Sequence, residues 1–221
     1  MGVALALHKL DTIVAARPGE RVATLGEIIH NPQVLEDYAR KGVHCLHSVE
    51  EAEADMSVLI RAHGITRDVE AELRRRCARV EDATCPRVKN AQLAIAEATA
   101  SGRELLLYGE AEHPEVRGLI SYAAGESRIF SSLEEMEAML EKTPPEGRAV
   151  VLAAQTTQDR LIFDEMHRRL VQRLGSSLVV LDTICDATRE RQEEAGEIAA
   201  RVQAMVVAGG KSSGNTRRLA E

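Results

Sequence analysis

The feature that most constrains the fold is a regular alternation of short apolar runs with amphipathic segments. Between the apolar runs, apolar residues recur at three- and four-residue spacing, with charges on the opposite face, as in helices that bury one side. Strands that alternate with helices build mainly parallel sheets, so the sequence predicts an α/β fold. The predicted strands are residues 21–25, 57–60, 104–108, 149–153, 178–181 and 204–208, and the clearest helices are residues 88–100, 133–141, 159–174 and 189–202.

Composition excludes several classes of partner. Of 221 residues, 28 are basic and 35 acidic, so the net charge of −7 gives no positive field toward nucleic acid or a membrane surface. Aromatic residues make up 2% of the chain, which leaves no stacking platform for single strands. We therefore expect no nucleic acid and no membrane partner, and any bound phosphate must meet local donors.

The cysteines are expected to be reduced. The apolar run 1–7 lacks a basic region before it and is closed by His8 and Lys9, so it does not form a secretory signal. No apolar stretch reaches the roughly 20 residues of a membrane span. In the cytoplasmic protein that this predicts, four cysteines are better explained as buried, metal-bound or catalytic than as disulfides. They show no CxxC spacing, which excludes a local zinc knuckle.

The two ends of the chain do not resemble those of a complete α/β domain. Residues 1–16 predict a helix with no strand before it, and residues 213–221 predict a helix with no strand after it. Ligands of parallel α/β folds sit at the carboxyl ends of strands, so a chain that begins on a helix is expected to lack a strand and its loop. We therefore expect a fragment.

Two cysteines occupy the same kind of junction. Cys85 follows a short predicted strand and precedes a helix that Pro86 can begin, and Cys185 also lies between a strand and a long helix. The positive end of a helix dipole favours the thiolate that iron or zinc binds. Small buried residues are the simpler alternative for each cysteine alone, but the shared position favours metal ligands. For Cys45, in a predicted strand 43–47, and Cys77, within a predicted charged helix, we expect structural roles.

Three histidines also lie where strands lead into helices. His30 precedes Asn31 and Pro32, which suit a helix cap and first helical position. His63 follows a strand, with Thr66 available to cap the next helix, and His113 precedes Pro114. Each alone is well explained as an ordinary loop residue. Together, imidazoles beside helix N-termini predict a pocket for a phosphate or diphosphate.

Two further junctions offer hydroxyls and amides. The segment 209–216 contains Ser213 and Asn215, and Gln155-Thr156-Thr157 follows the predicted strand 149–153. Gly210-Lys211-Ser212 is not a P-loop, because that motif needs an earlier glycine where this chain has Met205. Segment 209–216 supports the predicted phosphate pocket, with a capped turn without ligand as the alternative. Gln155-Thr156-Thr157 alone is weak evidence, since these hydroxyls could cap the next helix.

In order, these segments resemble the signature series of the 4-hydroxy-3-methylbut-2-enyl diphosphate reductases, the IspH/LytB family of iron–sulfur enzymes. The resemblance covers nearly the whole chain, and seven segments in register are far more specific than one. The segments are His30-Asn31-Pro32, Ala62-His63-Gly64, Asp82-Ala83-Thr84-Cys85-Pro86, His113-Pro114-Glu115-Val116-Arg117-Gly118, Gln155-Thr156-Thr157, Thr183-Ile184-Cys185 and residues 213–219.

The resemblance implies a function. In this family, electrons and protons remove the hydroxyl group of 4-hydroxy-3-methylbut-2-enyl diphosphate and give isopentenyl and dimethylallyl diphosphates, in the methylerythritol phosphate pathway of isoprenoid biosynthesis. The expected partners are this allylic diphosphate and an electron donor such as ferredoxin or flavodoxin. Two of the three cysteines that hold a 4Fe-4S cluster in this family are matched by Cys85 and Cys185. The diphosphate-binding groups are matched by His30, His63, His113, Ser213 and Asn215. Glu115 matches a proton-delivering carboxyl group, and Thr156 matches a hydroxyl beside the reacting oxygen.

The implied fold is a set of three small parallel-sheet α/β domains around a central cluster site: residues 1–84, 85–182 and an incomplete third domain, 183–221. The family's first cluster cysteine would fall immediately before Met1, and a late serine would follow Glu221. Gly214 stands where many relatives have serine. We therefore expect that this fragment fails to hold a stable cluster.

Two other classes of function fit some of the residues. One is a zinc-dependent phosphoester hydrolase with His30, His63 and His113 as ligands and Glu115 as base. The other is a non-catalytic module that binds diphosphate without a metal. Metal content and visible absorption distinguish the three.

Overall fold

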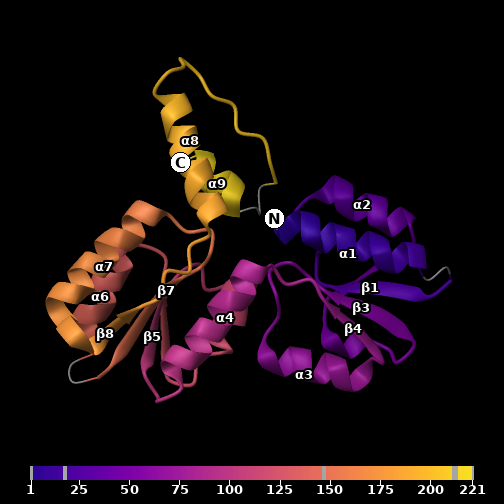
Figure 1. Ribbon diagram of the computed structural model, residues 1–221, viewed down its shortest axis with the longest axis horizontal. Coiled ribbons are helices and arrows are strands. Elements are labelled where there is room, and N and C mark those ends of the chain that lie inside the picture. Colours follow the sequence, from indigo (N-terminus) through magenta and orange to yellow (C-terminus); the bar gives the residue numbers. More distant parts are fainter. Residues whose placement is uncertain (1, 17–18, 146–147, 211–213, 221) are drawn as a thin grey trace. The chain divides into compact units, whose positions relative to one another are not determined.

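A computed structural model describes residues 2–16, 19–145, 148–210 and 214–220 of the protein. The chain divides into two units, Met1–Lys89 and Asn90–Glu221, each with its own four-stranded parallel sheet (Figure 1). The predicted α/β class is confirmed. The elements before residue 90 are α1 (Gly2–Ala16), β1 (Arg21–Leu25), α2 (Pro32–Arg40), β2 (His44–Leu46), the short helix Val49–Glu51, β3 (Met56–Ile60), α3 (Arg67–Arg76), β4 (Arg79–Asp82) and the start of α4 (Pro86–Thr99).

The first sheet has the strand order β2-β1-β3-β4. Helices α1 and α2 cover one face, where Leu10 and Tyr38 pack with Val22 and Leu59, and α3 covers the other face through Leu73 (Figure 1). The chain leaves β1 toward β2 and later returns to the other side of β1 to form β3. In such sheets, ligands bind at the carboxyl ends of the two strands where the order reverses, which are β1 and β3.

The second unit repeats this topology, with the order β6-β5-β7-β8. Helices α6 and α7 pack on one face through Met136 and Phe163, while α4 and α5 pack on the other through Ile95 and Leu119. The reversal lies between β5 and β7. The elements are β5 (Glu104–Tyr108), α5 (Pro114–Ile120), β6 (Ser127–Phe130), α6 (Leu133–Lys142), β7 (Val150–Ala154), α7 (Arg160–Leu174), the short helix Gly175–Ser177, β8 (Leu178–Val180), α8 (Asp186–Ala199) and α9 (Gly214–Ala220).

The predicted helix starts are confirmed by their caps. The Asn31 side chain accepts hydrogen bonds from the backbone N–H groups of Gln33 and Val34, and Pro32 is the first residue of α2. Thr66 caps α3 through Val69 N–H. Each cap satisfies backbone donors that have no partner within the helix.

One predicted strand is wrong and one strand was missed. In the described part of the chain, residues 204–208 form no strand; Met205 is 39% and Val206 92% exposed. An apolar run needs a neighbouring strand to satisfy its backbone groups, and no described segment pairs with this one. Edge strand β6 was not predicted, because its four residues combine Ser127 and Arg128 with two apolar side chains and so do not form an apolar run.

The domain limits 1–84, 85–182 and 183–221 stay a prediction. Residues after 182 belong to the second unit, where the described part contains α8 and α9. None of the described helices combines the length and apolar character needed to cross a membrane.

Candidate active site

The residues singled out in the sequence follow corresponding strands of the two units. The first strands, β1 and β5, lead to histidines; β3 and β7, across the reversal point, lead to polar residues; and the edge strands β4 and β8 lead to cysteines. Parallel strands place all these loops at the carboxyl edge of their sheet, where α/β folds bind ligands. The pairs are His30 with His113, His63 with Thr156, and Cys85 with Cys185.

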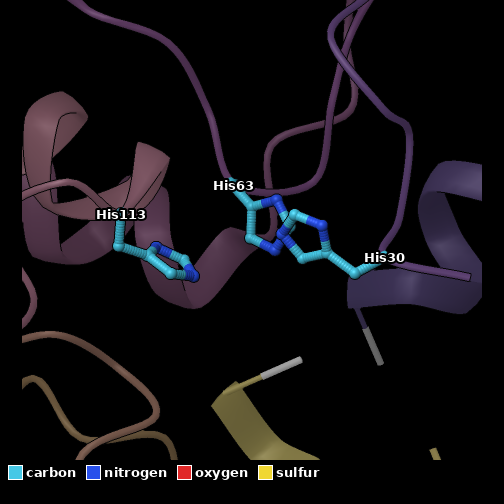
Figure 2. Close-up of side chains that lie close together, drawn as sticks. All are labelled: His30, His63 and His113. Carbon is cyan, nitrogen blue, oxygen red and sulfur yellow. The ribbon is translucent and has the colours of Figure 1, made fainter. Parts of the chain in front are cut away.

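In the first unit, the reversal point brings two of the predicted diphosphate-binding histidines together. The rings of His30 and His63 are stacked, with centroids 4.7 Å apart and 27° between their planes (Figure 2). Glu27, in the same loop as His30, lies with Oε2 3.1 Å from His30 Nδ1. The His30 side chain is only 16% exposed.

Backbone hydrogen bonds fix the position of Cys85. Its N–H donates to the carbonyl of Ala62, beside His63, at 2.9 Å, and Asp82 accepts from Thr84 N–H at 2.8 Å. Burial would raise the pKa of Asp82, but the Thr84 hydrogen bonds and the Lys89 charge outweigh it and lower this pKa. The result is a fixed turn with a half-buried thiol immediately before α4.

The first turn of α1 lies directly against this thiol. A Cβ atom added to Gly2 would lie 2.7 Å from both the Cβ and the Sγ atoms of Cys85. Only a residue without a side chain permits this approach, since real Cβ contacts are longer.

We expect Gly2→Ala to lower the free energy of unfolding by about 1–2 kcal/mol, because overpacking outweighs the better helix propensity of alanine. Urea denaturation measures the change. Gly196→Ala in α8 is the matched control, since a Cβ there meets nothing within 4 Å. That control should be neutral or stabilising by up to about 1 kcal/mol; equal stability of the two variants would contradict the packing at Cys85.

In the second unit, His113 and Glu115 are held at the start of α5. His113 is the cap residue, and its Nδ1 accepts a hydrogen bond from Glu115 N–H at 3.1 Å (Figure 2 labels its ring). The Glu115 side chain is buried, and its Oε1 accepts from Thr156 N–H at 2.6 Å. Burial raises the pKa of Glu115, opposed by hydrogen bonds from the Thr156 backbone and side chain. A buried carboxyl group beside a hydroxyl can hold and transfer a proton.

Thr156 also contacts the loop of the second cysteine. Its carbonyl accepts from Cys185 N–H at 2.9 Å, as the Ala62 carbonyl does from Cys85 in the other unit. Cys185 is the cap residue of α8, and in the described chain its half-buried side chain makes no capping hydrogen bond. The thiol therefore lies at a helix start, as the sequence predicted, and the structure adds that, among the described residues, it makes no capping hydrogen bond.

Helix α9 brings Asn215 to the same unit's loops. A Cβ on Gly214 would lie 3.0 Å from Thr157 Oγ1, and the Thr188 hydroxyl donates to Asn215 Oδ1 at 3.4 Å. Ser213, the other predicted diphosphate ligand of this segment, lies outside the described residues.

The groups that hold α9 in place were not predicted from the sequence. Arg218 donates to Glu110 at 3.1 Å and to Gln158 at 2.7 Å, and Arg217 also donates to Glu110. Glu110 lies in the loop between β5 and His113, 108 positions from Arg218, so no local pattern signals the pair.

The cysteines fit an iron–sulfur cluster in donor type. Thiolates are the soft ligands of such clusters, and Cys85 and Cys185 present half-buried thiols at helix starts. Cys77 differs, because it is buried at the end of α3, which it follows rather than lies within, and its S–H donates to the Glu53 carbonyl. Cys45 lies on edge strand β2. Cys85 and Cys185, each in its own unit, therefore have the donor type and the helix-start position expected of cluster ligands.

Comparison with known proteins gives consistent matches along the entire chain. A family model described as "LytB protein" matches residues 1–221. The 4-hydroxy-3-methylbut-2-enyl diphosphate reductase of Nitratidesulfovibrio vulgaris (strain DP4) is 56% identical over 229 residues, covering all of this chain and 78% of the relative. The enzyme of the same name from Desulfovibrio desulfuricans is 53% identical, with the same coverage.

Two solved structures resemble this one. A structure described as (E)-4-hydroxy-3-methyl-but-2-enyl diphosphate reductase, the terminal enzyme of the non-mevalonate pathway, matches with a TM-score of 0.72 and 36% identity. It covers 99% of this chain and 76% of the other. The E-1-hydroxy-2-methyl-but-2-enyl-4-diphosphate reductase from Plasmodium falciparum matches with a TM-score of 0.88 over 99% of this chain and 68% of the other; at 20% identity it supports the fold alone.

Proposed function

Because the chain belongs to the LytB family of 4-hydroxy-3-methylbut-2-enyl diphosphate reductases, we propose that its function is reductive dehydroxylation of 4-hydroxy-3-methylbut-2-enyl diphosphate to isopentenyl and dimethylallyl diphosphates. One observation in this structure supports the proposed chemistry beyond family membership. Thr156 joins the buried Glu115 carboxyl group, through its N–H, to the Cys185 loop, through its carbonyl. A proton-holding group and a predicted cluster ligand thus meet at one residue.

Protein groups bind and orient the substrate in this proposal. His30, His63, His113, Asn215 and Ser213 bind the diphosphate, and the positive ends of α2 and α5 add to the attraction. Fixing this end of the substrate leaves the hydroxyl end in one position for reaction.

Glu115 and Thr156 deliver a proton to the substrate hydroxyl, so that the C–O bond breaks with water as the leaving group. A second proton and two electrons complete the balance. The new C–H bond forms at the carbon that carried the hydroxyl group, which gives dimethylallyl diphosphate, or at the far carbon of the allylic double bond, which shifts that bond and gives isopentenyl diphosphate. A 4Fe-4S cluster held by Cys85, Cys185 and the third cysteine that the family resemblance implies would supply single electrons and withdraw charge from the leaving oxygen. Ferredoxin or flavodoxin is the proposed electron donor.

The proposal is tested with a longer protein. The chain covers 78% of its relative from N. vulgaris, so we call the chain lengthened to that relative's full length the extended protein. Assayed anaerobically with a one-electron reductant, it should convert the diphosphate substrate to both products. Binding without conversion would favour the non-catalytic module, and release of phosphate would favour the hydrolase.

In the extended protein, replacing His30, His63 or His113 with alanine should weaken substrate binding by about 1.5–3 kcal/mol, the range for hydrogen bonds to charged groups. Calorimetry measures the affinity, and iron content should stay unchanged. His44→Ala, at an exposed position in β2, is the matched control and should bind normally. Loss of metal from one of the three histidine variants would instead support the zinc-dependent hydrolase, in which these histidines bind zinc.

A further inference from the structure

His30 and His113, predicted to share one role, have opposite hydrogen-bonding patterns. A carboxylate only accepts hydrogen bonds, so the 3.1 Å contact from Glu27 Oε2 to His30 Nδ1 requires a proton on Nδ1. At His113 the backbone N–H of Glu115 donates to Nδ1, also at 3.1 Å, so the proton of the neutral ring sits on Nε2. The two rings therefore hold their protons on different nitrogens.

This difference matters for an anionic ligand. A neutral His113 can donate from Nε2 to a phosphate oxygen. A neutral His30 would present a lone pair at Nε2, which repels that oxygen, so His30 donates there only with protons on both nitrogens. The negative charge of Glu27 compensates that state, and a charge-assisted hydrogen bond is stronger than a neutral one.

The surroundings support an arrangement built around Glu27. The His30 side chain is 16% exposed, and within its own unit the Glu27 carboxylate and the stacked His63 ring contact it. The mostly buried Arg61, at the end of β3, interacts favourably with the charge of Glu27. Its guanidinium packs against Gly26, where φ is +77° and an added Cβ would lie 2.5 Å from Nη1.

We propose that Glu27 is a positioning residue for the diphosphate site, which fixes the His30 ring with a proton on Nδ1 and compensates the doubly protonated ring that binds the ligand. The inference rests on the proposed function, because it takes a diphosphate as the ligand. It assigns distinct tasks to the two histidines: His113 donates as a neutral ring, and His30 donates as a cation paired with Glu27.

Nitrogen NMR of the extended protein, labelled with ¹⁵N in histidine, tests which ring nitrogen carries the proton before the ligand binds. His30 should give the signals of an Nδ1-protonated ring, and His113 those of an Nε2-protonated ring. Glu27→Leu should move His30 to the Nε2-protonated form that an unconstrained histidine favours, and leave His113 unchanged. Glu36→Leu is the control, since it removes an equal charge from an exposed pair with Arg40. An Nε2-protonated His30 in the unsubstituted protein would overturn the proposal without any variant.

Inorganic diphosphate is the probe that tests whether Glu27 supports the doubly protonated His30 ring when the ligand binds. Binding should place protons on both nitrogens of His30, and Glu27→Leu should weaken binding about three- to tenfold, a modest effect because Glu27 is half exposed. Glu36→Leu should bind normally. Equal affinity of Glu27→Leu and the unsubstituted protein would overturn the role of Glu27 but leave the proposed function intact. Absence of diphosphate binding in the unsubstituted protein would contradict both.

Discussion

Replacing Cys85 or Cys185 with serine in the extended protein should remove most of its bound iron. Both thiols lie at helix starts in corresponding positions of the two units, and both are held by a backbone hydrogen bond from the cysteine N–H to a neighbouring loop. A serine oxygen is a poor substitute for the soft thiolate that iron–sulfur clusters require. Iron and sulfide analysis after anaerobic reconstitution measures the loss, which should be nearly complete.

The other two cysteines provide matched controls. Cys45→Ser changes an exposed residue on an edge strand, and Cys77→Ser changes a buried thiol whose hydrogen bond to the Glu53 carbonyl a hydroxyl can replace. Both variants should keep their iron. Full iron content in Cys85→Ser or Cys185→Ser would exclude that residue as a ligand.

Glu115→Gln should separate binding from turnover. The amide keeps the shape of the side chain and still accepts a hydrogen bond from Thr156 N–H, but it cannot deliver the proton of a carboxyl group whose pKa is raised by burial. General acid catalysis typically contributes a hundredfold or more, so the extended enzyme should lose on the order of a hundredfold in rate. Its affinity for the diphosphate substrate should stay near normal.

Glu112→Gln is the control for charge and location. Glu112 lies in the same loop, with its side chain 87% exposed and paired with Arg117. It should leave both rate and affinity unchanged. Near-normal turnover of Glu115→Gln would remove Glu115 from proton delivery and leave it with a structural role at the start of α5.

Local chemistry made the helix starts predictable from the sequence. Asn31 with Pro32, and His113 with Pro114, form cap and first-turn pairs whose signals lie within a few residues, so the loops beside His30 and His113 were found directly. The order of strands was not predictable in this way. That β1 pairs with both β2 and β3 depends on contacts between distant segments.

The same limit explains the contacts that were missed. The pair of Arg218 and Glu110 spans 108 positions, and the approach of Gly2 to Cys85 joins α1 to the loop before α4. Neither leaves a periodic pattern in the sequence. Conversely, residues 204–208 have strand propensity without a described neighbour to pair with, so a correct local signal led to a wrong strand. The assigned site roles of Cys85, Cys185, His30, His63, His113 and Glu115 stay predictions until their variants are measured. The roles of Thr156, Ser213 and Asn215 are predictions as well.

The most direct test of the account is metal analysis with a visible absorption spectrum of the anaerobically prepared extended protein. If the protein is an iron–sulfur reductase, it should contain about four iron and four sulfide ions per chain and show a broad visible absorption that bleaches on reduction. A colourless protein with stoichiometric zinc, or one that binds diphosphate and contains no metal, would contradict it.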